Sequence, residues 1–281
     1  MREAYVLGLS QTGFHRIAYT EWGDAINPRV LICAHGLTRN GRDFDALAAS
    51  LQDHYRVICP DYVGRGKSDW LANKADYGYP QYLADMTALI ARSAAVQVDW
   101  VGTSMGGITG MFIAAMARSP IRKMVINDVG SFIPKASLER IGQYVGKDPV
   151  FDSYDDFKAH VKLNSAPFGL KTEEQWDQIA KSSAKFEADG KVRFNSDPAI
   201  GDAFRSGPAA DIDLNPFWQA VNCPVLVTRG ENSDLLLRET YDAMLKKPEV
   251  TGVEFPDVGH APMFMDEAQI RPIRDFLLAD K

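Results

Sequence analysis

The 281-residue chain contains only three cysteines, and they do not form a metal-binding or disulfide pattern. Cys33, Cys59 and Cys223 lie far apart in the sequence, in or beside apolar runs. Buried free thiols usually have such neighbours, whereas a disulfide framework or a zinc site needs cysteines at characteristic spacings. The cysteine pattern therefore predicts a protein of the reducing cytoplasm.

Long apolar runs and clusters of positive charge are also absent. No stretch approaches the roughly 18–20 apolar residues of a membrane span, and the charged N-terminal decapeptide is too short for a signal peptide. Lysine and arginine total 31 against 37 aspartates and glutamates, a net charge of −6 without a basic run. We therefore expect no nucleic-acid partner and no membrane partner. No pattern indicates an oligomeric state.

The sequence does contain short apolar runs that alternate with longer, helix-compatible stretches. This order is typical of an α/β protein, with a parallel sheet covered by helices on both faces. The first thirty residues instead favour an antiparallel hairpin at the edge of the sheet. The predicted strands are 30–34, 56–60, 98–102, 124–128, 225–229 and 252–256. The predicted helices include 43–52, 81–95, 105–118 and 239–247.

The alternation is interrupted between residues 131 and 222. This stretch holds helix-like pieces without a convincing apolar strand, and structureless loops longer than about 15 residues are uncommon in compact domains. We therefore predict a helical cap at 131–222, inserted into a core domain formed by 1–130 and 223–281. A few aromatic residues of the cap should line the substrate pocket, and most should form its own core: Phe132, Tyr144, Phe168, Trp176, Phe204 and Trp218.

The segment Gly102-Thr103-Ser104-Met105-Gly106 fits the pattern G-x-S-x-G between a predicted strand and a predicted helix. A serine at this corner takes a strained backbone conformation, and small residues two positions away on either side avoid a clash with it. The segment therefore predicts that Ser104 is a nucleophile. The alternative is a glycine-rich turn with a polar filler.

A serine nucleophile needs a general base and an acid that orients the base. His260 follows the last predicted strand, at the carboxyl edge of the sheet where sites of open α/β sheets collect. Asp234 closes the loop after the preceding strand and is the preferred acid, which gives the chain order serine, acid, histidine. Asp128, which ends another strand, is the alternative acid. Glu231 and Asp257 are weaker rivals, and Asp257, although nearer to His260 in the sequence, is interpreted as part of a local turn.

The loop after the strand at 30–34 is the candidate for the oxyanion hole. Gly36 lets the backbone turn, so that the N–H of Leu37 can face the same point as the N–H of Met105, at the start of the helix after the serine. His35 is interpreted as a structural residue that braces this loop.

Two polar residues follow the oxyanion loop. Arg39 and Asn40 lie two and three positions beyond Leu37, which places them near the reacting group. We predict that they bind a polar or carboxylate-bearing substrate. For Arg39 the alternative is a solvated surface residue.

These motifs together resemble the capped serine hydrolases of the α/β-hydrolase fold family over nearly the whole chain. The resemblance implies a mostly parallel eight-stranded sheet, helices on both faces and an inserted lid after the sixth strand. It also implies that Asp61, Arg65 and Ser68 form a structural turn. Because position 104 is serine, members of the fold with an aspartate nucleophile, such as haloalkane dehalogenases, are excluded. The matching segments are 35–36, 61–68, 102–107, 127–130, 230–234 and 259–260.

The resemblance implies an acyl-enzyme on Ser104, formed without a metal or an organic cofactor. The expected partner is a small-molecule substrate, a small to medium carboxylic ester, with hydroxyacid esters, oligomers and lactones among the candidates. The segment 38–41 is similar to carboxylesterases and to hydrolases of hydroxyalkanoate oligomers. One alternative is carbon–carbon hydrolysis of a ring-fission diketone, or perhydrolysis, on the same triad. Another is a non-catalytic ligand-binding protein.

Overall fold

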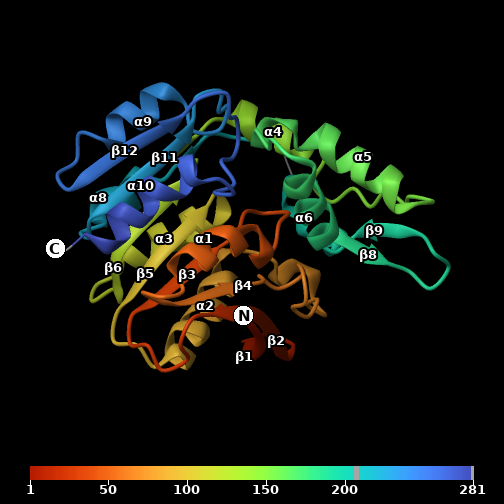
Figure 1. Cartoon of the computed structure of the whole chain (residues 1–281), viewed down its shortest axis with the longest axis horizontal. Helices are drawn as coiled ribbons and strands as arrows, with labels where there is room; N and C mark the ends of the chain where they lie inside the picture. The colour runs from red at the N-terminus through yellow and green to blue at the C-terminus, as the bar shows by residue number, and fades with distance from the viewer. Residues whose placement is uncertain (206–208, 280–281) are drawn as a thin grey trace.

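The fold is built around one mixed β-sheet. A computed structural model describes residues 1–205 and 209–279; residues 206–208 of the predicted cap and 280–281 of the predicted core lie outside the described residues. The sheet has eight strands in the order β1-β2-β4-β3-β5-β6-β11-β12 (Figure 1). They are β1 (Arg2–Ser10), β2 (Gly13–Trp22), β3 (Val30–Ala34), β4 (Arg56–Pro60), β5 (Val98–Thr103), β6 (Ile121–Asn127), β11 (Val225–Gly230) and β12 (Val250–Phe255).

The direction of the strands creates a crevice at one edge of the sheet. Neighbouring strands from β4 to β12 are parallel, and the hairpin of β1 and β2 is antiparallel. The parallel sheet and the antiparallel hairpin at its edge confirm the predictions made from the sequence. The chain places β4 on one side of β3 and β5 on the other side. At such a reversal the loops after neighbouring strands diverge, and ligands bind between them at the carboxyl edge of the sheet.

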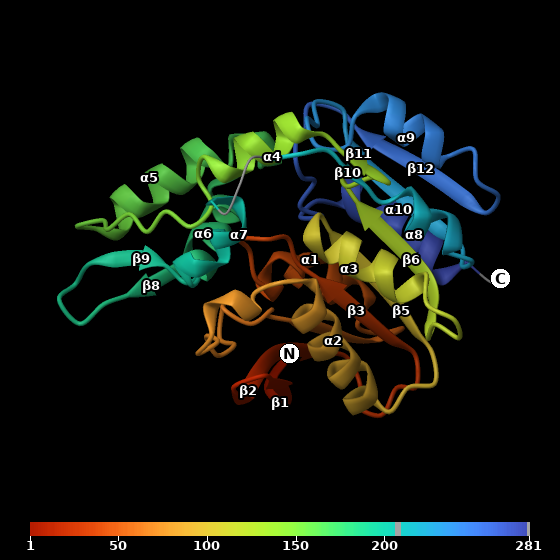
Figure 2. The ribbon, with the colours of Figure 1, turned by 180° about the vertical axis from the view of Figure 1, so that it is seen from behind.

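Helices cover both faces, so the central strands are largely apolar. Every residue of β3 and β4 is buried. Leu31 and Cys33 pack with α1 and α10, whereas Ile32 and Ala34 pack with α2 and α3, because side chains alternate along a strand. Figure 1 shows α1 and α10 on the near face, and Figure 2 shows α2, α3 and α8 on the opposite face. These helices are α1 (Asp45–Leu51), α2 (Tyr79–Ser93), α3 (Met105–Ala114), α8 (Asn215–Ala220), α9 (Arg238–Met244) and α10 (Glu267–Leu278). Among the helices of the described ranges, none is both long and apolar enough to cross a bilayer.

Most of the elements between β6 and β11 form a second group beyond the carboxyl edge of the sheet (Figures 1 and 2). Its helices α5 and α6 pack around Phe157, Val161 and Ile179, which form a small apolar cluster of their own. Thr172 begins α6 with a capping box, in which its side chain accepts from the N–H of Gln175. The helices are α4 (Lys135–Gly142), α5 (Tyr154–Asn164), α6 (Glu173–Ser183) and α7 (Asp202–Arg205).

This group also contains short strands that the sequence did not predict. Two ladders pair β7 (Phe132–Ile133) with β10 (Ile212–Asp213), and β8 (Ala184–Phe186) with β9 (Val192–Phe194). Each strand has only two or three residues, too few to show a periodic apolar pattern. Helix α8 packs against α3 and buries Trp218 in the main core, so the last helix before residue 222 lies against the sheet domain. Short 3-10 turns complete the elements: η1 (Gly41–Phe44), η2 (Lys74–Asp76), η3 (Ala166–Phe168) and η4 (Pro198–Gly201).

Candidate active site

Ser104 occupies a sharp corner between β5 and α3. Its φ of 52° and ψ of −116° lie in a region that costs a non-glycine residue strain energy. A Cβ on Gly102 would lie 2.3 Å from the carbonyl oxygen of Gly106, and a Cβ on Gly106 would lie 2.0 Å from that of Ala34. Only glycine therefore fits on either side of the serine, and the atoms that exclude a Cβ are backbone atoms of Gly106 and Ala34.

His260 and Asp128 complete a chain of hydrogen bonds that begins at Ser104. The serine Oγ lies 3.1 Å from Nε2 of His260, and Nδ1 of the same imidazole lies 2.8 Å from Oδ2 of Asp128. A carboxylate accepts from Nδ1–H, which leaves Nε2 as the acceptor of the serine proton. The arrangement is that of a nucleophile, a general base and an orienting acid.

The carboxylate of Asp128 is completely buried and fixed by several donors. The N–H of Gly230 donates to Oδ1 at 2.9 Å, and the hydroxyl of Ser233 donates to Oδ2 at 2.7 Å. Strands β6 and β11 are neighbours, so the loop after β11 reaches the residue that follows β6. Sequence analysis did not identify Ser233, because a serine in a polar loop gives no distinctive signal.

The structure does not bring Asp234, the acid preferred from the sequence, to His260. Its exposed carboxylate instead forms an ion pair with Arg140 of α4. The hydroxyl of Ser233 accepts from the N–H groups of Leu235 and Leu236, a turn that directs residue 233 inward. Asp234 consequently points outward, and the carboxylate that lies beside the imidazole is that of Asp128, the alternative acid.

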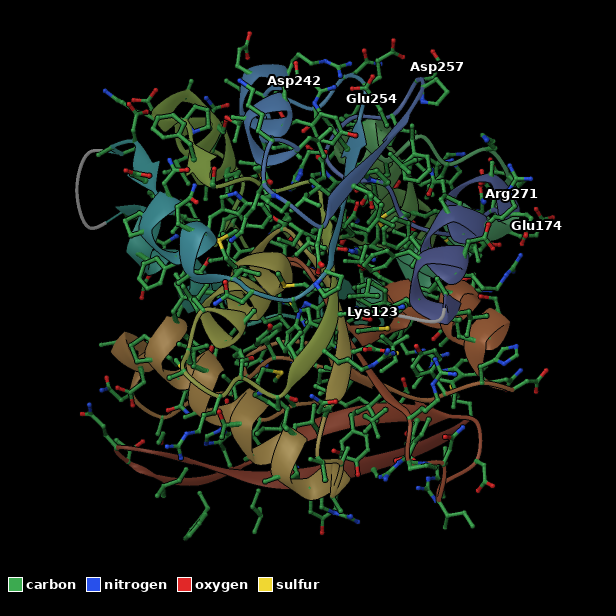
Figure 3. All side chains as sticks on the ribbon, turned by 90° about the vertical axis from the view of Figure 1, so that its left-hand side faces the viewer. Lys123, Glu174, Asp242, Glu254, Asp257 and Arg271 are labelled. Carbon is green, nitrogen blue, oxygen red and sulfur yellow. The ribbon has the colours of Figure 1, made fainter. Side chains whose placement is uncertain are left out.

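The two weaker rivals also lie away from the imidazole. Glu231 is exposed and accepts from the N–H of Asp257 at 3.3 Å. Figure 3 shows Asp257 at the outer surface, where its positive φ of 58° belongs to the turn after β12. This placement agrees with the prediction that Asp257 forms a local turn.

The loop after β3 lies directly against the serine. A Cβ added to Gly36 would be 3.7 Å from Cβ of Ser104, and Leu37 and Met105 both line the same cavity as the serine. Met105 is the first residue of α3, so its N–H has no acceptor within the helix. These positions suit the two N–H groups that the sequence suggested as oxyanion donors.

His35 braces this loop from the protein interior. Its Nε2 accepts from the N–H of Tyr62 at 2.9 Å, so Nδ1 carries the proton and donates to the carbonyl of Gly36 at 2.7 Å. Complete burial, together with the positive charges of Arg65 and Arg39, lowers the pKa of His35 to about 3, although its bond to the carbonyl of Gly36 acts in the opposite direction. The neutral imidazole is a structural residue, as the sequence indicated.

The side chains of Arg39 and Asn40 contact the group of elements between β6 and β11. Arg39 forms an ion pair with Asp43 and donates to the hydroxyl of Ser183 at 2.6 Å. Asn40 donates to the carbonyl of Ser182 at 2.9 Å. Arg39 borders the cavity and Asn40 does not. Both side chains thus hold the end of α6 against the oxyanion loop; Asn40 lies outside the cavity lining, and substrate binding by Arg39 stays a prediction.

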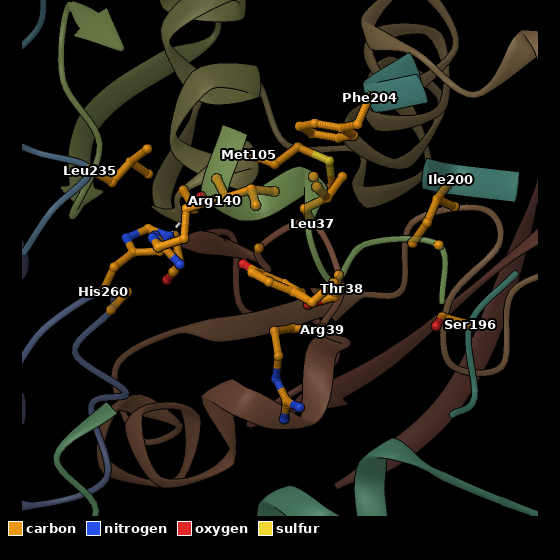
Figure 4. Close-up of a pocket in the computed structure, with 18 of the residues that line it drawn as sticks. Leu37, Thr38, Arg39, Met105, Arg140, Ser196, Ile200, Phe204, Leu235 and His260 are labelled. Atoms are coloured by element: carbon orange, nitrogen blue, oxygen red, sulfur yellow. Dashed lines mark hydrogen bonds between the residues drawn. The ribbon is translucent and has the colours of Figure 1, made fainter. Parts of the chain in front are cut away.

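A cavity of about 1220 Å³ extends from Ser104 and His260 toward the elements between β6 and β11 (Figure 4). Its lining there is largely apolar and includes Leu138, Ile141, Phe168, Ile200 and Phe204. Of the six aromatic residues that the sequence singled out, Tyr144, Phe168 and Phe204 line the cavity. The other three, Phe132, Trp176 and Trp218, do not. The space exceeds that of many small-ligand pockets, which fall near 300–1,000 Å³.

Arg140 supplies a cationic group at this cavity. Its Nη2 donates to Oδ1 of Asp234 at 2.9 Å, while 39% of its side chain remains exposed. A guanidinium has five N–H donors, and Asp234 does not use all of them. Arg140 is a cation that no sequence motif indicated, because it lies in a helix with no recognisable pattern.

Comparisons with known proteins agree with this geometry. Residues 29–267 match the α/β hydrolase fold family. The chain is 47% identical to a 3-hydroxybutyrate-oligomer hydrolase of Cupriavidus necator over 96% of this chain and 95% of the relative. It is 27% identical to a 2-(acetamidomethylene)succinate hydrolase of Mesorhizobium japonicum over 82% and 81%. The crystal structure of a putative hydrolase from Rickettsia typhi superposes with a TM-score of 0.94 at 34% identity, with both chains completely covered. The chain therefore belongs to the α/β-hydrolase fold family, as its sequence motifs predicted.

Proposed function

We propose that this protein is a serine hydrolase that cleaves carboxylic esters, with short oligomers of 3-hydroxy acids as the leading substrate class. The observation that carries the proposal is the hydrogen-bonded series Ser104, His260 and Asp128 at a cavity of about 1220 Å³. The similarity to a 3-hydroxybutyrate-oligomer hydrolase supports the substrate class.

The first half of the reaction forms an acyl-enzyme. The Oγ of Ser104 attacks the ester carbonyl carbon as Nε2 of His260 accepts the serine proton. The tetrahedral intermediate then collapses, and the same Nε2 gives its proton to the leaving alkoxide. Asp128 fixes the tautomer of the imidazole and stabilises its transient positive charge.

The second half of the reaction repeats these steps with water. His260 takes a proton from the water that attacks the acyl carbonyl, and the intermediate expels Oγ of Ser104 with that proton. The carboxylic acid leaves, and the serine hydroxyl is restored. In both halves the N–H groups of Leu37 and Met105 donate to the oxyanion, a contribution of about 10²–10³ in rate for one such donor.

Arg140 fits the chemistry of the proposed substrate. A hydroxyacid oligomer ends in a free carboxylate, and a guanidinium binds a carboxylate through charge-assisted hydrogen bonds. Arg140 borders the cavity and is partly exposed, so we assign it the terminal carboxylate in place of Arg39 and Asn40. The apolar lining suits the methyl-substituted chain between the two ends.

The elements between β6 and β11 are proposed to act as the cap over this substrate. They supply Arg140 and most of the apolar lining, and α6 is held to the oxyanion loop through Ser182 and Ser183. Because α8 packs on α3, the cap is proposed to end before α8 and not at residue 222. A reducing, cytoplasmic location is likewise proposed, and the three free cysteines support it.

Two assays test the proposal. A fluorophosphonate probe should label the wild-type protein at Ser104 and should not label Ser104→Ala. The wild type should hydrolyse 3-hydroxybutyrate dimers and trimers, and Ser104→Ala should not. Labelling without turnover of these oligomers or of p-nitrophenyl esters would overturn the ester assignment. Efficient turnover of a vinylogous 1,5-diketone alone would establish the carbon–carbon alternative, and a folded protein that resists the probe would indicate a binding protein.

A further inference from the structure

Arg65, in the turn after β4, has no solvent-exposed surface. Its Nε donates to the carbonyl of Leu37 at 2.9 Å. Its Nη1 donates to the carbonyl of Val63 at 2.8 Å and to the phenol of Tyr82 at 2.9 Å. Its Nη2 lies 3.9 Å from the sulfur of Met105. One buried guanidinium therefore contacts both residues that are proposed to hold the oxyanion.

The positive charge of Arg65 is solvated by neutral groups of the protein. In the described ranges its hydrogen-bond partners are three neutral oxygens, of two carbonyls and a phenol, and the sulfur of Met105, and its guanidinium carbon lies 5.1 Å from the centre of the Tyr82 ring. A buried cation without a carboxylate partner is costly for stability. A neutral side chain could brace the same turn without this desolvation cost. We therefore expect the positive charge of Arg65 to have a role beyond packing.

The contacts of Arg65 and His35 fix the two peptide planes on either side of Leu37. His35 holds the carbonyl of Gly36, and that carbonyl shares a rigid peptide plane with the N–H of Leu37. Arg65 holds the carbonyl of Leu37 itself, in the next plane. Rotation of the proposed oxyanion donor is thereby restricted from both sides.

We propose that Arg65 is a positioning residue of the oxyanion hole, and that its buried positive charge favours the negative tetrahedral intermediate over the neutral ester. This inference rests on the proposed function. A charge that acts on the oxyanion stabilises the transition state more than the bound ester, so its loss lowers kcat more than it raises KM. The Coulomb effect of Arg65 on the pKa of the nearby His35 agrees with a field that reaches this loop.

The test compares Arg65→Gln and Arg65→Lys with Arg56→Gln as a matched control. Arg56 is also buried but lies at the far end of β4, where it contacts Glu21 and the carbonyl of Ser93. Measurements are kcat and KM on a p-nitrophenyl ester per site titrated with fluorophosphonate, Tm, and the affinity of an arylboronic acid, which forms a tetrahedral anion on serine. We expect Arg65→Gln to lower kcat about 10²-fold, with KM changed less than about threefold and boronate affinity reduced in parallel. Arg65→Lys should recover part of kcat, and Arg56→Gln should lower only Tm.

Several outcomes would overturn the inference without affecting the proposed function. One is an Arg65→Gln protein whose Tm falls as in Arg56→Gln while kcat per titrated site and boronate affinity stay at wild-type values. If Arg65→Gln does not fold, Arg65→Lys decides, because lysine keeps the charge but cannot reach all three acceptors in the fork geometry of arginine. A loss of kcat of at least about tenfold in that variant supports the role, and an unchanged kcat overturns it. Failure of the proposed function is distinguishable, since the wild type itself would then show no ester turnover.

Discussion

Ser233 donates its hydroxyl to Oδ2 of Asp128 at 2.7 Å, and the same oxygen lies 2.8 Å from Nδ1 of His260. The carboxylate is thus shared between His260 and a loop from the neighbouring strand. The geometry places Asp128, and not Asp234, beside the imidazole.

Asp128→Asn should lower kcat on the order of 10⁴-fold, because an amide can stabilise the wrong imidazole tautomer and carries no charge. Asp234→Asn should leave kcat within a few-fold of the wild type, since Asp234 contacts Arg140 and not His260. Steady-state kinetics on one activated ester, normalised to titrated sites, compare the two variants. Severe inactivation by Asp234→Asn with an active Asp128→Asn would reverse this assignment.

The strained backbone of Ser104 predicts different stabilities for two inactive variants. Alanine keeps a Cβ at φ 52°, whereas glycine adopts positive φ without this penalty. Ser104→Gly should therefore have a free energy of unfolding about 1 kcal/mol higher than that of Ser104→Ala. Urea denaturation of both proteins provides the measurement. Equal midpoints and slopes would show that the strain is absent in solution.

Burial of neutral His35 predicts a loss of stability in acid. The pKa of His35 is about 3 in the folded protein, against about 6.5 in an unfolded chain. Between these values the unfolded state binds more protons, so the free energy of unfolding falls as pH falls from about 6.5 toward 3, with a limiting slope of about 1.4 kcal/mol per pH unit. In His35→Gln the part of this decrease that comes from protonation of the imidazole should be missing.

Asp61 changes the free energy of unfolding with pH in the opposite direction, and comparing wild type with His35→Gln removes this contribution. Burial raises the pKa of Asp61 to about 6, so the folded state binds the extra proton between about 4 and 6 and gains stability on acidification. Because Asp61 is present in both proteins, the difference between wild type and His35→Gln isolates the histidine. Parallel curves of unfolding free energy against pH would contradict the prediction.

Arg140→Gln should raise KM for 3-hydroxybutyrate oligomers about tenfold or more, since a charge-assisted bond to carboxylate is replaced by a neutral one. KM for the methyl esters of the same oligomers should hardly change, because these lack the terminal charge. Lys147→Gln, at another cation of the cavity lining, is the matched control. A similar rise in KM for acids and methyl esters would show that Arg140 acts through packing alone.

The fold, Ser104 and His260 were predictable because each rests on a local or strongly periodic signal. The parallel strands are largely apolar runs, and the glycines around the serine form a local sequence pattern, although the backbone that excludes a Cβ at Gly106 belongs to Ala34. The short strands β7–β10 were not predictable, because two or three residues carry no period.

The acid could not be chosen from the sequence. Loops after β6 and β11 both reach the same edge of the sheet, so position along the chain admits either Asp128 or Asp234. The choice depends on the turn at Ser233, which decides which side chain faces inward. The contacts of Arg39 and Asn40 could not be predicted for a related reason: the sequence places both residues near the serine but does not show that their side chains donate to Ser183 and Ser182 of α6.

The hydrogen bonds of Arg39 and Asn40 to the end of α6 connect the oxyanion loop to the elements above the cavity. The same short loop carries the N–H of Leu37 on one side and the anchor of the cap on the other. A displacement of α6 would therefore be transmitted to the loop whose N–H is proposed to polarise the ester carbonyl, so the position of α6 and the geometry of the oxyanion loop are mechanically linked.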